Sequence, residues 1–76
     1  MSTDERNTAK ALGRRIRAAR EAAGLKQVEL ARRCGVISTT AWRWEDGRAE
    51  PALPMLRVIA SETGADLGWL VRGDAA

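Results

Sequence analysis

Apolar residues recur at helical spacing in the first third of the chain. One stripe is formed by Leu12, Ile16, Ala19 and Ala23. Their separations of four, three and four positions place them on one side of an α-helix. Gly24 is expected to end this helix, because glycine accepts the left-handed backbone that often follows a last turn, and Leu25 should pack against that end.

Two short helices are predicted next, with three residues between them. The first covers QVELARRCG (27–35) and ends at Gly35, where a positive φ is expected. Its apolar face consists of Leu30, Ala31 and Cys34. The second covers TTAWRWED (39–46), and its N-cap is either Ser38 or Ile37, which would be a poor cap. A short turn that begins with glycine has the spacing of a helix-turn-helix.

The last third of the chain predicts two more helices. One begins near Leu53, with Pro54 in the first turn, where its missing N–H group costs nothing, and ends at Gly64. Its inner stripe is Leu56, Ile59, Ala60 and Thr63. Asp66 is expected to cap a final short helix, LGWLVR (67–72). The predicted fold class is therefore all-α, with five short helices.

Composition agrees with one small helical domain. The chain has 76 residues, with two prolines and neither Tyr nor Phe. No apolar run is long enough for a membrane span or a signal peptide, and a single cysteine cannot form an internal disulfide. We expect a cytoplasmic protein with its folded domain at residues 10–73. Residues 1–9 are expected to be a flexible N-terminus and residues 74–76 a C-terminal tail.

Charge suggests a polyanionic partner, and the residue types argue against catalysis. The net charge is +3, but residues 10–33 carry +6 and residues 36–76 carry −2. However, basic residues on a helix often form only a solvent-exposed face. We expect this of Arg14, Arg15 and Arg17. With no histidine, one cysteine and scattered serines, the chain offers no histidine base, catalytic triad or histidine metal ligand. We therefore expect no enzymatic activity and no cofactor, with Cys34 as a small core residue.

Several motifs in order resemble the helix-turn-helix domain of the Cro/C1-type (XRE-like) phage repressors. They are RxxRxxxGLxQ (17–27), ELA (29–31), GV (35–36), RWExG (43–47) and the ending GADLGWLVRG (64–73). The resemblance extends from Leu12 to Gly73. It implies a compact five-helix repressor-like fold that binds duplex DNA as a homodimer and regulates transcription, as a repressor. Its recognition helix would enter the major groove of a palindromic operator.

The resemblance also implies roles for individual residues. Arg20 and Glu45 correspond to a buried ion pair between the first and third helices, the alternative being two ordinary surface charges. Gln27 matches a glutamine used against DNA phosphate and a neighbouring recognition side chain. The expected phosphate contacts, which position a protein without specifying bases, are Lys26, Arg33 and Arg48.

Helical periodicity separates the two neighbouring tryptophans. At about 100° per residue, Ala41 and Trp44 share the core side of helix 38–45. The opposite face, which would enter the groove, consists of Ser38, Thr39, Trp42 and Arg43. Arg43 is the best base-contacting candidate, because a guanidinium bonds both O6 and N7 of guanine, whereas the two hydroxyls discriminate weakly. Trp42 either contacts a thymine methyl or sugar, or lies over a neighbouring helix at the rim of the core.

The chain departs from the family pattern at three positions, and one other class of function stays open. Ile37 stands where a capping Ser or Thr is usual, Ala41 where Ile or Val is usual, and Trp42 where the residue is small or polar. Family members often dimerise through the last helix, so its apolar residues are expected in the dimer interface as well as the core. They are Leu67, Trp69 and Val71. The alternative function is a protein-interaction module of the same fold, such as an antitoxin that binds a toxin partner.

Overall fold

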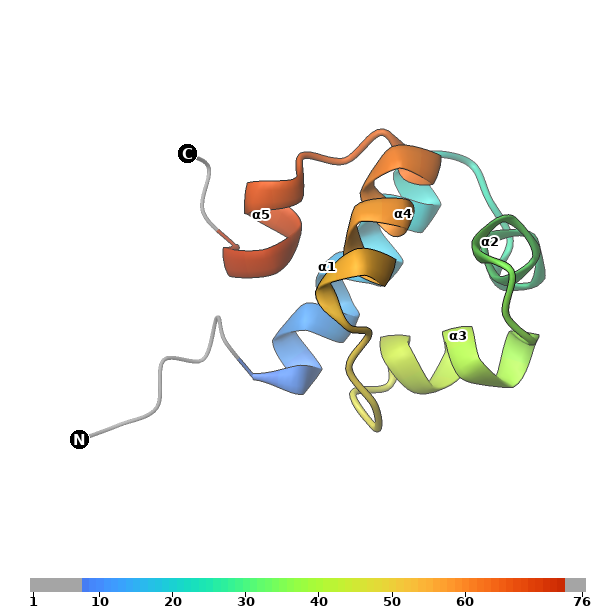
Figure 1. Ribbon diagram of the computed structural model, residues 1–76, viewed down its shortest axis with the longest axis horizontal. Helices are drawn as coiled ribbons and strands as arrows, with labels where there is room; N and C mark the ends of the chain where they lie inside the picture. Colours follow the sequence, from blue (N-terminus) through green and yellow to red (C-terminus); the bar gives the residue numbers. More distant parts are fainter. Residues whose placement is uncertain (1–7, 74–76) are drawn as a thin grey trace.

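The computed structural model describes residues 8–73, and this part of the chain forms five α-helices joined by short loops (Figure 1). They are α1 (Ala9–Ala22), α2 (Gln27–Cys34), α3 (Ser38–Glu45), α4 (Leu53–Thr63) and α5 (Leu67–Arg72). The predicted all-α fold of five helices is confirmed. Most of the expected N-terminal and C-terminal tails lies outside the described residues. Two residues of the expected N-terminal tail are described. Ala9 is the first residue of α1, and Thr8 is its N-cap, whose hydroxyl accepts from the Ala11 N–H at 3.0 Å.

The hydrophobic core takes side chains from all five helices. Its buried members are Leu12, Ile16, Leu30, Ala31, Cys34, Ala41, Trp44, Leu56, Ile59, Ala60 and Leu70. Burial of each large aliphatic side chain stabilises the fold by about 1.5–3 kcal/mol. The expected stripe of α1 extended one residue too far, since Ala23 is exposed. The helix already ends at Ala22, and Gly24 follows with φ of +73°.

The helix-turn-helix is formed by α2 and α3. Gly35 ends α2 with φ of +73°, as predicted, and the Val36 N–H donates to the Ala31 carbonyl at 2.9 Å. Ile37, not Ser38, is the N-cap residue of α3, and it provides no side-chain cap. Its side chain is 71% exposed. The third helix packs against both α1 and α2, along one edge of the molecule (Figure 1).

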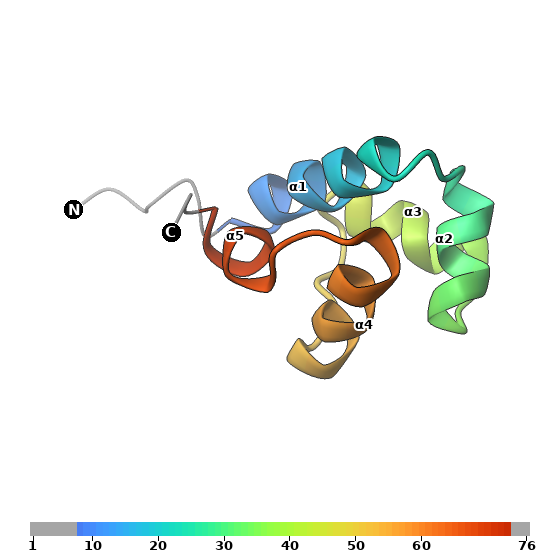
Figure 2. The ribbon, with the colours of Figure 1, turned by 90° about the horizontal axis from the view of Figure 1, so that it is seen from above.

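The last helix packs on α1 and α4, at the opposite end of the molecule from α2 (Figures 1 and 2). Asp66 caps it by accepting from the Trp69 N–H at 2.8 Å, as predicted. The expectation that Arg15 is solvated surface is wrong. Its guanidinium donates to the carbonyl oxygens of Leu70 at 2.8 Å and Val71 at 3.1 Å. The final carbonyls of a helix lack partners within the helix, so an arginine from α1 satisfies them here.

Candidate nucleic-acid interface

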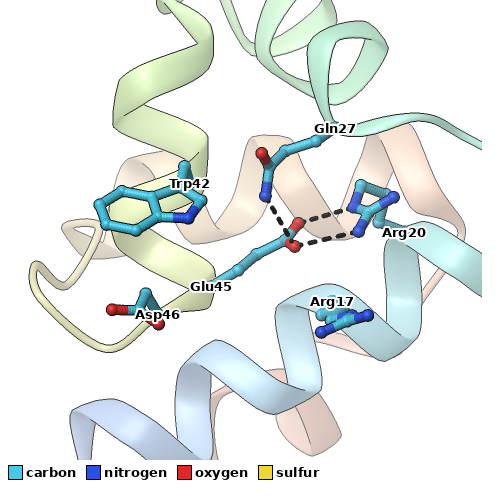
Figure 3. A pocket seen from close by; sticks show the side chains of 6 residues that line it. All are labelled: Arg17, Arg20, Gln27, Trp42, Glu45 and Asp46. Carbon is cyan, nitrogen blue, oxygen red and sulfur yellow. Dashed lines mark hydrogen bonds and ion pairs between the residues drawn. The ribbon is translucent and has the colours of Figure 1, made fainter.

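A buried polar network connects α3 to α1 and α2 (Figure 3). The Glu45 carboxylate accepts from Arg20 Nε at 2.7 Å and from Arg20 Nη2 at 3.1 Å, and Gln27 Nε2 donates to it at 3.1 Å. The Arg20 and Glu45 side chains are only 12% and 6% exposed. These two residues are those that the resemblance paired, and they are not ordinary surface charges.

The network satisfies its charged groups internally. A third bond from Arg20, from Nη1 to the Leu25 carbonyl at 2.9 Å, also joins the guanidinium to the chain that leads into α2. The hydrogen bond to Glu45 raises the pKa of Arg20 above its usual value, against the opposing effect of burial. Arg20 belongs to α1, Gln27 begins α2 and Glu45 ends α3. The network therefore fixes the position of α3 relative to α1 and α2.

The outer face of α3 is accessible, whereas its inner face is core. Ala41 is buried and Trp44 is only 5% exposed, which confirms the core position predicted for this tryptophan. The side chain of Trp42 is 43% exposed. A shallow pocket of about 300 Å³ is lined by Gln27, Ser38, Thr39 and Trp42. Thus the fold brings four of the expected DNA-contacting residues together on one surface, and Arg43 is also exposed.

The end of α3 carries a second polar cluster that the sequence analysis missed. Arg48 Nε donates to the Asp46 carboxylate at 2.6 Å, and the guanidinium carbon lies 5.1 Å from the ring centroid of Trp42. The hydrogen bond from Arg48 holds the pKa of Asp46 below its usual value. One signal was present in the sequence, because Trp42 and Asp46 are four residues apart on one helix face. The position of Arg48, however, depends on how the following loop turns.

The remaining basic candidates lie apart from one another. Lys26 is the N-cap residue of α2, and it is exposed. Its backbone N–H donates to the Glu29 carboxylate at 2.7 Å. Arg33 lies in the last turn of α2, with Nη1 3.8 Å from a carboxylate oxygen of Glu62 in α4. This partner of Arg33 could not be predicted from the sequence, because Glu62 is 29 positions away and lies in another helix.

Residues 8–73 contain neither a metal site nor a membrane-spanning helix. Cys34 is buried, as predicted, and burial raises the pKa of its thiol. No group of histidine, cysteine or acidic residues with the geometry of a metal site occurs within the described range. Nor does that range include a helix with the length and hydrophobicity needed to span a bilayer.

The arrangement of α2, the turn and α3 defines a small helix-turn-helix domain. Residues 11–70 match the family of helix-turn-helix domains, and the chain belongs to that family. An uncharacterized HTH-type transcriptional regulator of Haemophilus influenzae is 42% identical to the chain over 45 residues. This match includes 59% of the chain but only 19% of the relative, so the matched segment corresponds to about a fifth of that protein.

Proposed function

We propose that this domain binds duplex DNA sequence-specifically and regulates transcription as a repressor of the Cro/C1 (XRE-like) type. The observation that carries the proposal is the way α3 is held in the fold, with one side fixed and the other exposed. Its inner side is held by core packing and by the network around Glu45, and its outer face presents hydroxyl, indole and guanidinium groups. A helix mounted in this way fits the major groove of B-DNA, where base edges are distinguishable. The name of the Haemophilus influenzae relative agrees with a regulatory role.

Residue roles follow from position and chemistry. Arg43 is the proposed guanine contact, with Ser38 and Thr39 as weaker base contacts nearer the start of α3. Lys26, Gln27 and Arg48 are proposed phosphate contacts, which orient the domain on the duplex. Arg33 is proposed as a further phosphate contact, which requires its guanidinium to leave Glu62.

The proposed assembly on DNA is a homodimer that uses α5. Leu67, Trp69 and Val71 are partly buried and pack against the core, so each also leaves apolar surface accessible. Their helix lies at the far end of the molecule from α2, so a second copy bound there would leave the outer face of α3 free (Figures 1 and 2). Two copies related by a two-fold axis would require a near-palindrome with half-sites about 34 Å apart.

The experiment is a selection from a random duplex pool, followed by a salt titration with the enriched sequence. We expect a near-palindrome and an affinity that falls steeply with salt, because each neutralised phosphate contributes about −0.9 to the log–log slope. Binding should be insensitive to a chelator. No enrichment, together with no salt-dependent binding of the unselected duplex pool, would contradict DNA binding and favour a protein-interaction module such as an antitoxin.

A further inference from the structure

The backbone after α3 turns back along the helix and brings Arg48 beside it. The Gly47 N–H donates to the Trp44 carbonyl at 3.2 Å, and the Arg48 N–H donates to the Arg43 carbonyl at 2.9 Å, which is the pattern of a Schellman motif. Gly47 has φ of +75°, and a Cβ atom on it would lie 2.9 Å from Lys10 Cα. Both the backbone conformation and the contact with α1 therefore require glycine at this turn.

Two neighbours then restrain the Arg48 side chain. Asp46 accepts from its Nε at 2.6 Å, and the Trp42 ring lies under the guanidinium at 5.1 Å. Trp42 and Asp46 both line the pocket that is also lined by the residues of the buried network (Figure 3). The two terminal amino groups of Arg48 make no hydrogen bond to any residue from 8 to 73, and the side chain is 64% exposed. They remain available to donate hydrogen bonds to an anionic ligand.

We propose that Trp42 and Asp46 are positioning residues that hold Arg48 ready to contact a DNA phosphate, and that Trp42 acts through Arg48 and not by contacting a base. This inference rests on the proposed function. A long arginine loses rotamer freedom when it binds, and a side chain that is already restrained loses less. The guanidinium also lies over one face of the indole ring, which makes that face unavailable to a thymine methyl. The geometry thus assigns Trp42 a role different from both alternatives that its helical position suggests.

The first test uses the free protein and NMR. The ring current of Trp42 should shift the Arg48 Hδ protons upfield. Trp42→Leu should abolish this shift, whereas Trp42→Phe, which keeps an aromatic face, should retain part of it. Random-coil shifts for Arg48 in the unaltered protein would overturn the inference, because no stack would then exist in solution.

The second test measures affinity for the selected duplex and for a panel with single base-pair changes. Trp42→Leu should weaken binding about two- to fivefold on every sequence, in keeping with an exposed cation–π contact. Arg48→Ala should reduce the affinity by at least the same factor. The double variant Trp42→Leu/Arg48→Ala should bind the duplex as tightly as Arg48→Ala alone. Trp42→Phe, which keeps an aromatic ring, should keep most of the affinity of the unaltered protein. As a matched control, Trp42→Leu and Arg43→Ala should have independent effects that multiply.

The outcomes separate this inference from the proposed function. If Trp42→Leu changes the preferred base at one position, or if its effect multiplies with that of Arg48→Ala, Trp42 contacts DNA directly and the inference is wrong while the function stands. If the unaltered protein binds no duplex in a salt-dependent manner, the proposed function fails, and the role of Arg48 on phosphate fails with it. A ring-current shift in that case would leave the stack as a purely structural contact.

Discussion

A methyl group on Gly13 of α1 would lie 2.5 Å from the backbone carbonyl oxygen of Trp44 in α3. It would also lie 2.6 Å from the Glu45 carbonyl oxygen. Real side chains do not approach backbone atoms so closely, and neither helix offers a flexible group that could move aside. The absence of a side chain at position 13 thus allows α3 to approach α1 and allows Glu45 to reach Arg20.

Gly13→Ala should destabilise the domain by about 1–3 kcal/mol, as expected of overpacking. Helix propensity alone would predict the opposite effect, because alanine is more stable than glycine inside a helix by about 0.5–1 kcal/mol. The matched control is Ala18→Gly, at an exposed position of the same helix, which should cost about that amount. Urea unfolding of the variants measures both. A more stable Gly13→Ala protein would contradict the close contact.

Arg20 and Glu45 should show strong coupling in a double-mutant cycle. Removal of either partner leaves a mostly buried charge without its counter-charge, at a cost of about 2–4 kcal/mol. We propose Arg20→Met and Glu45→Leu, with chemical unfolding of the single and double variants. The exposed pair Arg17–Glu21 in α1 is the control, for which about 0.5 kcal/mol or less is expected. A coupling energy no larger than that of the control pair would show that the network does not stabilise the fold.

Arg43→Ala should change base preference as well as affinity. If Arg43 bonds a guanine, its loss costs about 1–3 kcal/mol on the best site and relaxes the choice at one base pair in each half-site. Lys26→Ala is the comparison, because loss of a phosphate contact weakens all sequences about equally and lowers the salt slope by about one per protomer. The assignment is wrong if Arg43→Ala keeps its base preferences while its salt slope falls.

Trp69→Ala should shift the protein from dimer toward monomer. The side chain is partly buried in its own domain, so the remaining indole surface is available to a second copy. Sedimentation at several concentrations measures the shift, and circular dichroism checks that the helices persist. Trp42→Ala, which alters the other end of the molecule, should leave the oligomeric state unchanged. A concentration-independent monomer that still binds DNA as one protomer per site would exclude the proposed dimer.

Acidification should release Arg48 from Asp46. The pKa of Asp46 is lowered by the hydrogen bond from Arg48, so the pairing is fully present above the ordinary carboxyl pKa of about 4 and is lost as the pH falls through the lower, folded-state value. The Arg48 Hε resonance should report this transition, and Asp46→Asn should abolish it. A transition near pH 6 or 7 would mean that Asp46 does not have the arrangement described above.

Local patterns in the sequence determined the helices and much of the candidate surface. Apolar residues three and four positions apart predicted the core side of α1 to α4, and glycine and Asp66 marked helix ends, because these effects involve neighbours within one or two turns. In α5, by contrast, the fully buried residue is Leu70 and not one of the three expected apolar residues. The same periodicity separated Trp44, which is core, from Trp42, which is exposed. Where two caps competed, at Ser38 and Ile37, the sequence left both open and the structure selected Ile37.

Apart from the Arg20–Glu45 pair, which the family resemblance implied, the contacts between helices were decided only by the tertiary structure. Arg15 is more than fifty positions from the carbonyls it satisfies, Arg33 faces Glu62 in another helix, and Gln27 completes the site around Glu45. Arg48 meets Trp42 only because the chain reverses at Gly47 against α1. Periodicity states which side of a helix faces the core, but it does not state at what angle or distance two helices cross. A long side chain finds its partner according to that crossing, so the roles of these residues appear only in the folded molecule.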